Sequence, residues 1–268
     1  MNQQIIAVAN EKGGVAKTTT VISLGGALAQ TGHEVLLIDL DAQANLSLGL
    51  GIDPTRVRRS IADVLLNSAS ILSVSRETSV PGLDIVPANA DMGLAERFLP
   101  VRQNYELILK NVLRNNPAIA TYKYILLDCP PSLGAVTTNA LSVADFAIAP
   151  TQPEYFSAYG LRSLMAAIRR VRGQTNPNLA YYILITMMDR RNRIHRTMYE
   201  QLSVTFGEGL LKTIIEVDTK LRESTVAGLP ITHYIPKSRS ASQYGALAQE
   251  LVENVEQKTT TEHSQQPN

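Results

Sequence analysis

A glycine-containing loop near the start of the chain constrains the fold more than any other feature of the sequence. Residues 11–18 read EKGGVAKT and join an apolar run at residues 5–9 to a helical pattern that begins near Lys17. Gly13 and Gly14 allow a tight turn that aims backbone N–H groups at one point, where the start of a helix adds partial positive charge. A plain strand-to-helix turn with a solvated lysine is the alternative, but the length and context of the motif favour a phosphate-binding loop.

Similar apolar runs recur along the chain and alternate with amphipathic stretches. The expected strands are residues 5–9, 35–39, 83–86, 124–128, 146–149, 182–186 and 211–215. The expected helices are residues 17–30, 105–113, 161–171, 195–202 and 241–255. Runs with few interior polar residues suit strands that are covered on both faces. The alternation therefore predicts an α/β protein with a three-layer P-loop NTPase fold, in which helices cover both faces of a mainly parallel twisted sheet.

Length and composition favour one domain. The chain has 268 residues, of which 44% are apolar, and this is enough to bury the core of one large domain. No internal stretch rich in proline, glycine or serine is long enough to be an interdomain linker. Residues 258–268, KTTTEHSQQPN, are polar and lack apolar periodicity. We therefore expect a single P-loop domain at residues 1–257 and a disordered polar tail at residues 258–268.

The composition also excludes several classes of function. The single cysteine, Cys129, excludes an internal disulfide and an all-cysteine metal cage, which fits a reducing cytosol. The first residues lack the basic and long apolar segments of a secretion signal, and no window approaches the ~18 uninterrupted apolar residues of a membrane span. We therefore expect a soluble cytoplasmic protein. Because the net charge is only +1, binding of nucleic acid would need a local basic patch.

The first helical residues after the loop carry the side chains expected to bind a nucleotide. Lys17 would contact the β- and γ-phosphates, and the hydroxyl of Thr18 would ligate Mg²⁺. Asp128 ends the apolar run 124–128 and is placed as a Walker B residue, which holds Mg²⁺ through its water shell. These residues predict ATP and Mg²⁺ as cofactors.

Asp39 and Asp41 add two carboxylates where the run 35–39 ends. In an extended chain, residues two positions apart point to the same side. An aspartate at a strand end is more often a turn former or a helix cap than a catalytic group. That alternative is weaker here because the carboxyl ends of parallel strands meet beside the phosphate loop, so we expect these two acids and Asp128 to converge.

Several segments resemble the ParA/MinD superfamily. Residues 12–18, KGGVAKT, resemble its deviant Walker A motif, whose mark is an additional lysine at the position of Lys12. Residues 39–43, DLDAQ, resemble its switch I, and residues 128–134, DCPPSLG, resemble its Walker B and switch II. Later segments are also similar, at residues 152–155, 186–189 and 221–223. The match covers residues 4–255 and is greatest to the partition ATPases called ParA or Soj.

The resemblance implies an ATPase, slow on its own, that forms an ATP-dependent sandwich dimer in which Lys12 reaches across to the partner's phosphates. A cation placed at a γ-phosphate neutralises charge that develops in the transition state. The resemblance also implies that Asp41 orients the attacking water and that Asp39 helps to organise the Mg²⁺ shell. The expected catalytic residues are Lys12, Lys17 and Asp41. The expected Mg²⁺-binding residues are Thr18, Asp39 and Asp128. The expected nucleotide-binding residues are Lys12, Gly13, Gly14, Val15, Ala16, Lys17, Thr18, Thr19, Val217 and Asp218.

Three positions depart from the family pattern. Ala16 stands where the family usually has glycine, and Ala42 stands where switch I usually has proline. Residues 216–218, EVD, replace part of a segment that commonly reads Ile-Pro-Arg-Asn and contacts adenine. The methyl group of Ala16 is harmless if the local φ is negative, but it crowds the phosphates or the partner subunit if the glycine conformation is required.

The resemblance implies that ATP-bound dimers bind nonspecific double-stranded DNA and associate with the nucleoid. Basic residues follow the expected strand 182–186 and recur later in the chain. The expected DNA-binding residues are Arg190, Arg191, Arg193, Lys220 and Arg222. Their contacts to phosphate would be independent of base sequence and steeply dependent on salt. A solvated loop and helix face is the alternative interpretation of the arginine run. A ParB-like or adaptor protein would stimulate hydrolysis, and the cargo is a chromosome, a plasmid or a protein organelle.

Two other classes of function stay open. A MinD-like protein positions itself on a membrane through a final basic amphipathic helix, whereas the expected helix 241–255 and the residue after it carry Glu250, Glu253 and Glu256. Acidic residues there disfavour an anionic membrane surface, so we expect no membrane partner. A metabolic enzyme with the same deviant loop is the other alternative. An iron-protein relative is excluded because its bridging cluster needs two cysteines per subunit.

Overall fold

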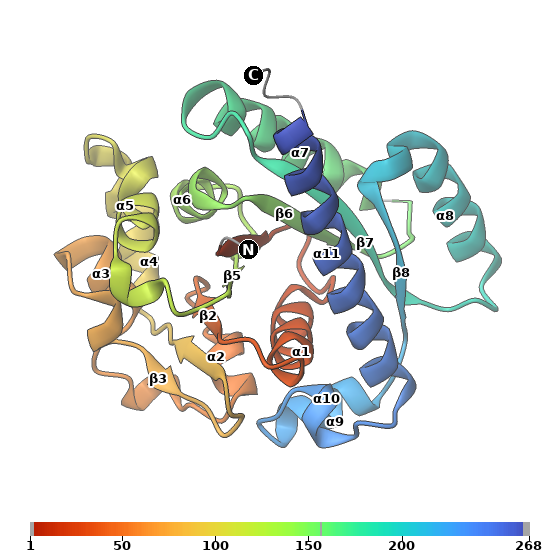
Figure 1. The fold of residues 1–268 in the computed structure, drawn as a ribbon, viewed down its shortest axis with the longest axis horizontal. Helices are drawn as coiled ribbons and strands as arrows, with labels where there is room; N and C mark the ends of the chain where they lie inside the picture. Colours follow the sequence, from red (N-terminus) through yellow and green to blue (C-terminus); the bar gives the residue numbers. More distant parts are fainter. Residues whose placement is uncertain (1–2, 156, 265–268) are drawn as a thin grey trace.

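A central sheet of eight strands organises the molecule (Figure 1). The computed structural model describes residues 3–155 and 157–264. The strands are β1 Gln4–Val8, β2 Val35–Asp39, β3 Arg76–Glu77, β4 Leu83–Val86, β5 Tyr124–Asp128, β6 Phe146–Thr151, β7 Ala180–Met188 and β8 Leu210–Glu216. Their order across the sheet is β3-β4-β2-β5-β1-β6-β7-β8, and only the pair β3 and β4 is antiparallel. The expected mainly parallel sheet is confirmed, with the short edge strand β3 as an addition that the apolar pattern did not predict.

Helices cover both faces of this sheet (Figure 1). The α-helices are α1 Lys17–Gln30, α2 Asn45–Gly49, α3 Ile61–Asn67, α4 Met92–Phe98, α5 Ile108–Arg114, α6 Ala135–Val143, α7 Ser157–Gln174, α8 Arg193–Phe206, α9 Lys220–Val226, α10 Ile231–Tyr234 and α11 Arg239–Ser264. One buried apolar cluster joins Ile5 and Ala7 of β1 to helices α3 to α8, and a second joins Ile6 and Val8 to α1, α10 and α11. Successive residues of a strand point to opposite faces of the sheet, so each cluster lies between the sheet and one layer of helices. This arrangement is the expected three-layer fold.

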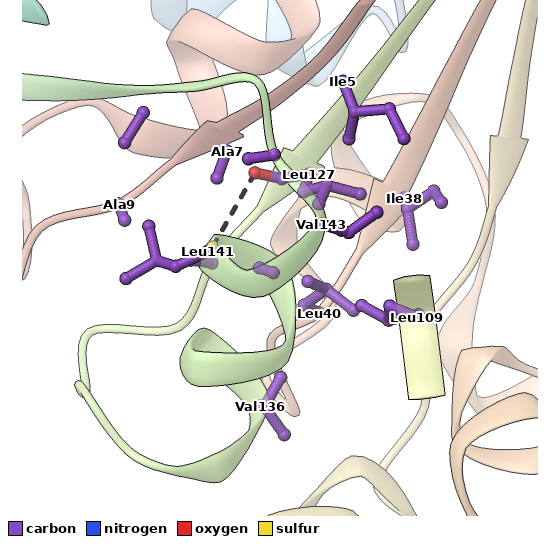
Figure 2. Packing of buried hydrophobic residues seen from close by; sticks show 14 of the residues in the cluster. Ile5, Ala7, Ala9, Ile38, Leu40, Leu109, Leu127, Val136, Leu141 and Val143 are labelled. Carbon is purple, nitrogen blue, oxygen red and sulfur yellow. Dashed lines mark hydrogen bonds between the residues drawn. The ribbon is translucent and has the colours of Figure 1, made fainter. Parts of the chain in front are cut away.

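Figure 2 shows part of the first cluster, in which Leu127 of β5 and Leu141 of α6 lie near Ala7 of β1 and near Ala9, which follows that strand. Cys129 follows β5 and is only 1% exposed, and its thiol donates a weak hydrogen bond to the carbonyl oxygen of Leu127 at 3.9 Å. Burial raises the pKa of the Cys129 thiol well above its usual range. The only cysteine of the chain is therefore a packing residue rather than a reactive thiol.

The register of the central strands brings their carboxyl ends to one level. β1 lies between β5 and β6, and β2 pairs with β5 on its other side. Asp128 at the end of β5 is paired in register with Val8 of β1 and with Asp39 of β2. The residues that follow these strands therefore converge at one edge of the sheet, which is where ligands of parallel sheets bind.

Some boundaries differ from the sequence-based expectations. The expected helix 105–113 is a 3-10 turn, Tyr105–Leu107, followed by α5. The last helix, α11, ends at Ser264, so residues 258–264 of the predicted disordered tail continue a helix. Extending an existing helix is far easier than nucleating one, and the packed part of α11 supplies the nucleus. Residues 265–268 of the predicted tail lie outside the described residues, and the boundary at residue 257 stays a prediction.

The helix α11 also covers the edge strand β8. The carboxylate of Glu250 accepts hydrogen bonds from the backbone N–H groups of Lys212 and Thr213, at 2.6 and 2.9 Å. Gln243 accepts one from the N–H of Glu216 at 3.1 Å. Unpaired edge groups invite pairing with another chain, so the acidic side chain of Glu250 has a structural role on this strand. None of the helices in the described part of the chain is long and apolar enough to cross a bilayer.

Candidate nucleotide-binding site

The loop between β1 and α1 adopts two left-handed backbone conformations. Gly14 has φ +72°, and Ala16, at the N-cap of α1, has φ 67° and ψ 33°. A Cβ atom added to Gly13 or Gly14 would meet nothing within 4 Å, so the space beside the loop is open to a ligand. Glycine adopts a positive φ readily, whereas an L-residue there costs about 1–2 kcal/mol. The alanine that replaces the usual family glycine at position 16 is therefore in the glycine conformation, which is the strained of the two cases set out above.

Lys17 and Thr18 open the helix α1 and face the end of β5. Lys17 is only 7% exposed, and its Nζ atom donates a hydrogen bond to the carbonyl oxygen of Lys12 at 3.2 Å. Burial lowers the pKa of Lys17, while the nearby Asp128 carboxylate acts in the opposite direction. The hydroxyl of Thr18 donates to Oδ2 of Asp128 at 2.7 Å. A helix start, a lysine, a hydroxyl and a carboxylate thus converge, as expected for binding of phosphate with Mg²⁺.

Asp128 is 1% exposed, and among the described residues its Oδ1 atom has no hydrogen-bond partner. Burial raises the pKa of Asp128 well above its usual range, and the nearby Asp39 carboxylate raises it further. A divalent cation relieves both effects, because it supplies the missing partner and offsets the repulsion. The described residues include no group of three or more His, Cys, Asp or Glu that would hold a metal alone. Mg²⁺ is commonly bound through one or two carboxylates, and phosphate oxygens and water complete its shell.

Asp39 has a different surrounding from Asp128. Its Oδ2 atom accepts hydrogen bonds from the N–H and the hydroxyl of Ser47, at 2.9 and 2.7 Å, and its Oδ1 atom accepts one from the N–H of Asp41 at 3.2 Å. Burial raises the pKa of Asp39 to about 6. The side chain holds the segment that follows β2, so its contact to Mg²⁺ stays a prediction. Ser47, which the sequence analysis did not identify, is the residue that anchors it.

A cavity of about 720 Å³ extends from the loop to the residues after β8. Nine of the residues predicted to bind nucleotide or act in catalysis line it, namely Gly13, Gly14, Ala16, Lys17, Thr18, Thr19, Asp41, Val217 and Asp218. Other lining residues were not predicted, among them Gln43, Asn45, Pro131, Met187 and Tyr244. Gln43 and Pro131 belong to the segments that resemble switch I and switch II. Their place in these segments could have identified them as site residues from the sequence. Val15 is buried beneath the loop, where its carbonyl oxygen accepts a hydrogen bond from Thr186.

Lys12 is the second residue of the loop and is not among the residues that line this cavity. Its Nζ atom is 2.8 Å from Oε2 of Glu154, and the two side chains are 29% and 43% exposed. Its backbone N–H donates to Oδ1 of Asn10 at 3.0 Å, and Asn10 in turn donates to the carbonyl oxygen of Pro150. The additional lysine of the deviant motif is thus held by a carboxylate of its own chain. Glu154 belongs to the segment 152–155 that resembles the family, but its role was not predicted.

The far end of the cavity is built from the segment after β8. Asp218 accepts hydrogen bonds from the hydroxyl of Ser240 at 2.8 Å and from the N–H of Lys220 at 3.1 Å. The N–H of Val217 donates to the carbonyl oxygen of Met188 at 3.1 Å. Met187, with φ 53°, lies where the pairing of β7 with β8 shifts register. A bulge of this kind re-aims a strand next to a site, and here it places Met187 in the cavity wall.

The predicted DNA-binding residues are all exposed but have different partners. Arg190 forms an ion pair with Glu216, with Nε and Oε1 2.5 Å apart. Arg191 pairs with Asp189 at 3.2 Å, and its side chain is 92% exposed. Arg193 opens α8, whereas the other two lie on α9, namely Lys220 and Arg222. Arg222 also lines the cavity that extends from the phosphate loop, so this part of the basic set lies beside the candidate nucleotide site.

Comparisons with known proteins agree with this geometry. A family model described as AAA domain matches residues 3–181. The chain is 40% identical to the chromosome partitioning protein ParA of Caulobacter vibrioides over 250 residues, which cover 93% of this chain and 94% of ParA. It is 38% identical to the sporulation initiation inhibitor protein Soj of Bacillus subtilis, over 94% of this chain and 99% of Soj.

A solved structure of cobyrinic acid a,c-diamide synthase from Mycobacterium smegmatis, with a bound ATP analogue and magnesium, is also similar. It is 33% identical with a TM-score of 0.81, over 95% of this chain and 96% of that one. The mainly parallel sheet and the identity of 38% to 40% with Soj and ParA, over at least 93% of each chain, lead to one assignment. This chain belongs to the ParA/MinD-type partition ATPases.

Proposed function

We propose that this protein is a slow, ATP-dependent dimerisation switch that binds nonspecific double-stranded DNA and segregates or positions a DNA cargo. The observation that carries the nucleotide part is the phosphate end of the cavity, where Thr18 and Asp128 are joined at 2.7 Å beside the buried Lys17. The switch part rests on Lys12, a second lysine that Glu154 holds outside the cavity.

ATP binding follows from the side chains at the loop. Lys17 would hold the β- and γ-phosphate oxygens, and the open backbone at Gly13 and Gly14 would donate N–H groups to them. Thr18 and the unpartnered oxygen of Asp128 would hold Mg²⁺, which supplies positive charge for the phosphate oxygens.

Hydrolysis is assigned to Asp41, which lines the same cavity. Its Oδ1 atom accepts a hydrogen bond from the N–H of Gln43 at 2.9 Å, and its own N–H is held by Asp39. These bonds orient the carboxylate, which would accept a proton from the attacking water. Asp39 and Ser47 are positioning residues for this step, because they hold the segment that carries Asp41.

Lys12 is the residue that would couple ATP to dimerisation. In one subunit the Glu154 carboxylate neutralises it at 2.8 Å. In a sandwich dimer the phosphates of the partner subunit would replace Glu154 as the counter-charge, and a phosphate is the stronger anion. Lys12→Ala is therefore expected to bind nucleotide but to lose the ATP-induced dimer, as measured by light scattering. An unchanged dimer in this variant would contradict the role of Lys12.

DNA binding is assigned to the exposed basic residues after β7 and on α9. Arg191, Arg193, Lys220 and Arg222 are exposed side chains in a chain whose net charge is only +1. Dimerisation would double this basic surface, so a nearly neutral subunit would bind DNA only in the ATP state. Arg191→Glu is expected to weaken binding to any duplex and to reduce the salt slope. A ParB-like or adaptor protein would stimulate hydrolysis and reset the switch on the nucleoid.

A metabolic role is the second candidate, since the similar synthase structure belongs to an enzyme that forms amides. Amide formation that takes ammonia from glutamine commonly uses a cysteine nucleophile. The only cysteine here is 1% exposed, with a pKa that burial raises well above its usual range. The chemistry of the chain therefore favours the partition role.

Co-sedimentation with ATP separates the candidates in one set of tubes. The protein is mixed in parallel with duplex DNA, with anionic liposomes, or with neither, and ADP replaces ATP in the controls. ATP-dependent pelleting with DNA is expected. Pelleting with liposomes alone would indicate a MinD-like membrane switch. A monomer that hydrolyses ATP but pellets with neither partner would contradict the proposal and favour a metabolic enzyme.

A further inference from the structure

Glu216, the last residue of β8, forms ion pairs with two arginines from different parts of the chain. Its Oε1 atom is 2.5 Å from Nε of Arg190, and its Oε2 atom is 2.9 Å from Nη1 of Arg239. The Glu216 side chain is 16% exposed, whereas those of Arg190 and Arg239 are 64% and 53% exposed. The half-buried carboxylate therefore binds both guanidinium groups, and most of the surface of the two arginine side chains stays exposed to solvent.

The two arginines border a second cavity, of about 420 Å³. Its lining residues are Met188, Asp189, Arg190, Arg191, Glu216, Val217 and Arg239. Three arginines and two carboxylates line this cavity, so the carboxylates of the protein neutralise most of the positive charge of the arginines. A DNA phosphate presents two anionic oxygens, and arginines bind such groups in the way in which they bind a carboxylate. A phosphate of the DNA backbone and the Glu216 carboxylate are thus alternative partners for the same arginines.

Glu216 also borders the nucleotide cavity, where it lies beside Val217. Arg239 donates a hydrogen bond from Nη2 to the carbonyl oxygen of Val217 at 2.6 Å. The N–H of Glu216 is held by Gln243 of α11 at 3.1 Å. The same short segment therefore forms part of the wall of the nucleotide cavity and part of the wall of the arginine-lined cavity. A shift of this segment on nucleotide binding would change the position of Glu216 in the arginine-lined cavity.

We propose that Glu216 acts as an internal competitor for DNA, occupying Arg190 and Arg239 until a backbone phosphate replaces it. This inference rests on the proposed DNA binding and adds its regulation. It also extends the DNA-contacting surface to Arg239, on a helix where the sequence analysis placed no DNA contact. Without nucleotide, the paired Glu216 keeps the affinity for DNA low, and nucleotide binding against the segment 216–218 favours the exchange.

The test compares Glu216→Gln with the matched control Glu208→Gln. Both variants remove one negative charge from an end of β8, but Glu208 lies in the turn before the strand, at the end opposite Glu216. Fluorescence anisotropy measures the affinity for a labelled duplex, without nucleotide and with Mg-ATP, over a series of salt concentrations. Thermal unfolding of each variant, with and without Mg-ATP, checks that it is folded and binds nucleotide.

Glu216→Gln is expected to bind DNA without nucleotide about ten-fold more tightly than the wild-type protein, with a steeper salt slope, because each freed arginine can release about one counterion. Adding both Arg190→Ala and Arg239→Ala to this variant should remove most of the gain, and Glu208→Gln should show no comparable gain. Glu216→Gln that binds like the wild-type protein or like Glu208→Gln would overturn the inference, while ATP-dependent DNA binding by the wild-type protein would keep the proposed function. Absence of DNA binding in all variants would overturn both.

Discussion

The two ends of the nucleotide cavity are built in different ways. At the phosphate end, one loop and the first turn of α1 supply Gly13, Gly14, Lys17 and Thr18, and Asp41 and Asp128 come from the ends of β2 and β5. At the opposite end, the segment 215–219 is held by side chains of α11 and lies beside a bulge at Met187. The first end offers backbone N–H groups and the side chains of Lys17 and Thr18, which suit the phosphates that every nucleotide carries. The second end depends on side chains, so it is free to differ between relatives that share the same loop.

This comparison predicts that removing a polar side chain at the phosphate end has a larger effect than removing one at the opposite end. The largest is expected for Asp41→Ala, which removes the carboxylate assigned to the attacking water. Turnover of ATP should fall by about 100-fold or more, the range seen when one positioned catalytic group is lost, while binding and ATP-dependent dimerisation persist. Phosphate release and light scattering on the same sample measure the two properties. Full activity in this variant would remove the assignment of Asp41.

Asp128→Asn is expected to stabilise the nucleotide-free protein while abolishing its response to Mg²⁺. Within residues 3–155 and 157–264, one oxygen of the buried Asp128 carboxylate has no hydrogen-bond partner, which costs about 1–3 kcal/mol of folding free energy when the group is ionised. Its pKa is raised in the folded state, so the folded protein binds more protons than the unfolded one, and stability falls as pH rises above the unfolded-state pKa. The advantage of the variant in thermal unfolding should therefore be larger at pH 8 than at pH 5. A variant less stable than the wild-type protein at pH 8 would contradict this account.

At the other end of the cavity, Asp218→Ala is expected to have a moderate effect. The variant loses the hydrogen bonds to Ser240 and to the N–H of Lys220, each worth about 1 kcal/mol, so the segment that borders the nucleotide becomes less ordered. The affinity for ATP should fall by about five- to ten-fold, with little change in turnover at saturation. Isothermal titration with ATP and ADP measures the affinity. A loss of affinity as large as that caused by Lys17→Ala would contradict the prediction that the phosphate end contributes more to binding.

The smallest effect is expected for Ala16→Gly. Ala16 has φ 67°, so glycine should relieve strain and stabilise the protein by roughly 0.5–1 kcal/mol, in spite of the larger entropy of the unfolded chain. Thermal unfolding without nucleotide measures the strain, and ATP turnover shows whether the methyl group affects the reaction. Equal turnover in both proteins would mean that the methyl group is silent in the reaction. No gain in stability would mean that the strain is relieved elsewhere in the loop.

The structure brings together the residues that the sequence analysis assigned to the phosphate end, and most of them are close together along the chain. Lys17 and Thr18 follow the glycines directly, and Asp128 ends an apolar run that is easy to recognise as a buried strand. Ala16 shows the limit of this reasoning. The departure from glycine was visible in the sequence, but whether it mattered depended on the backbone angle at that position, which only the structure provides.

The partners of several predicted site residues were not predicted, because tertiary contacts bring them together. Lys12 pairs with Glu154, which is 142 residues away, and Asp39 is held by Ser47 across a turn. Arg190 was predicted as a DNA contact from its charge, but the structure pairs it with Glu216. The sequence shows where basic residues occur along the chain, whereas their ion-pair partners depend on how β7, β8 and α11 pack against one another.

By itself, the sequence determined the parallel sheet, the phosphate loop and the order of the elements around them, because hydrophobic periodicity and glycine placement act locally. The tertiary structure decided the strand order, the register that pairs Asp39 with Asp128, and the ion pairs of Lys12, Arg190 and Arg239. The physical reason is the range of the forces involved. Backbone preferences act over a few residues, whereas burial and charge pairing depend on which distant segments are packed together.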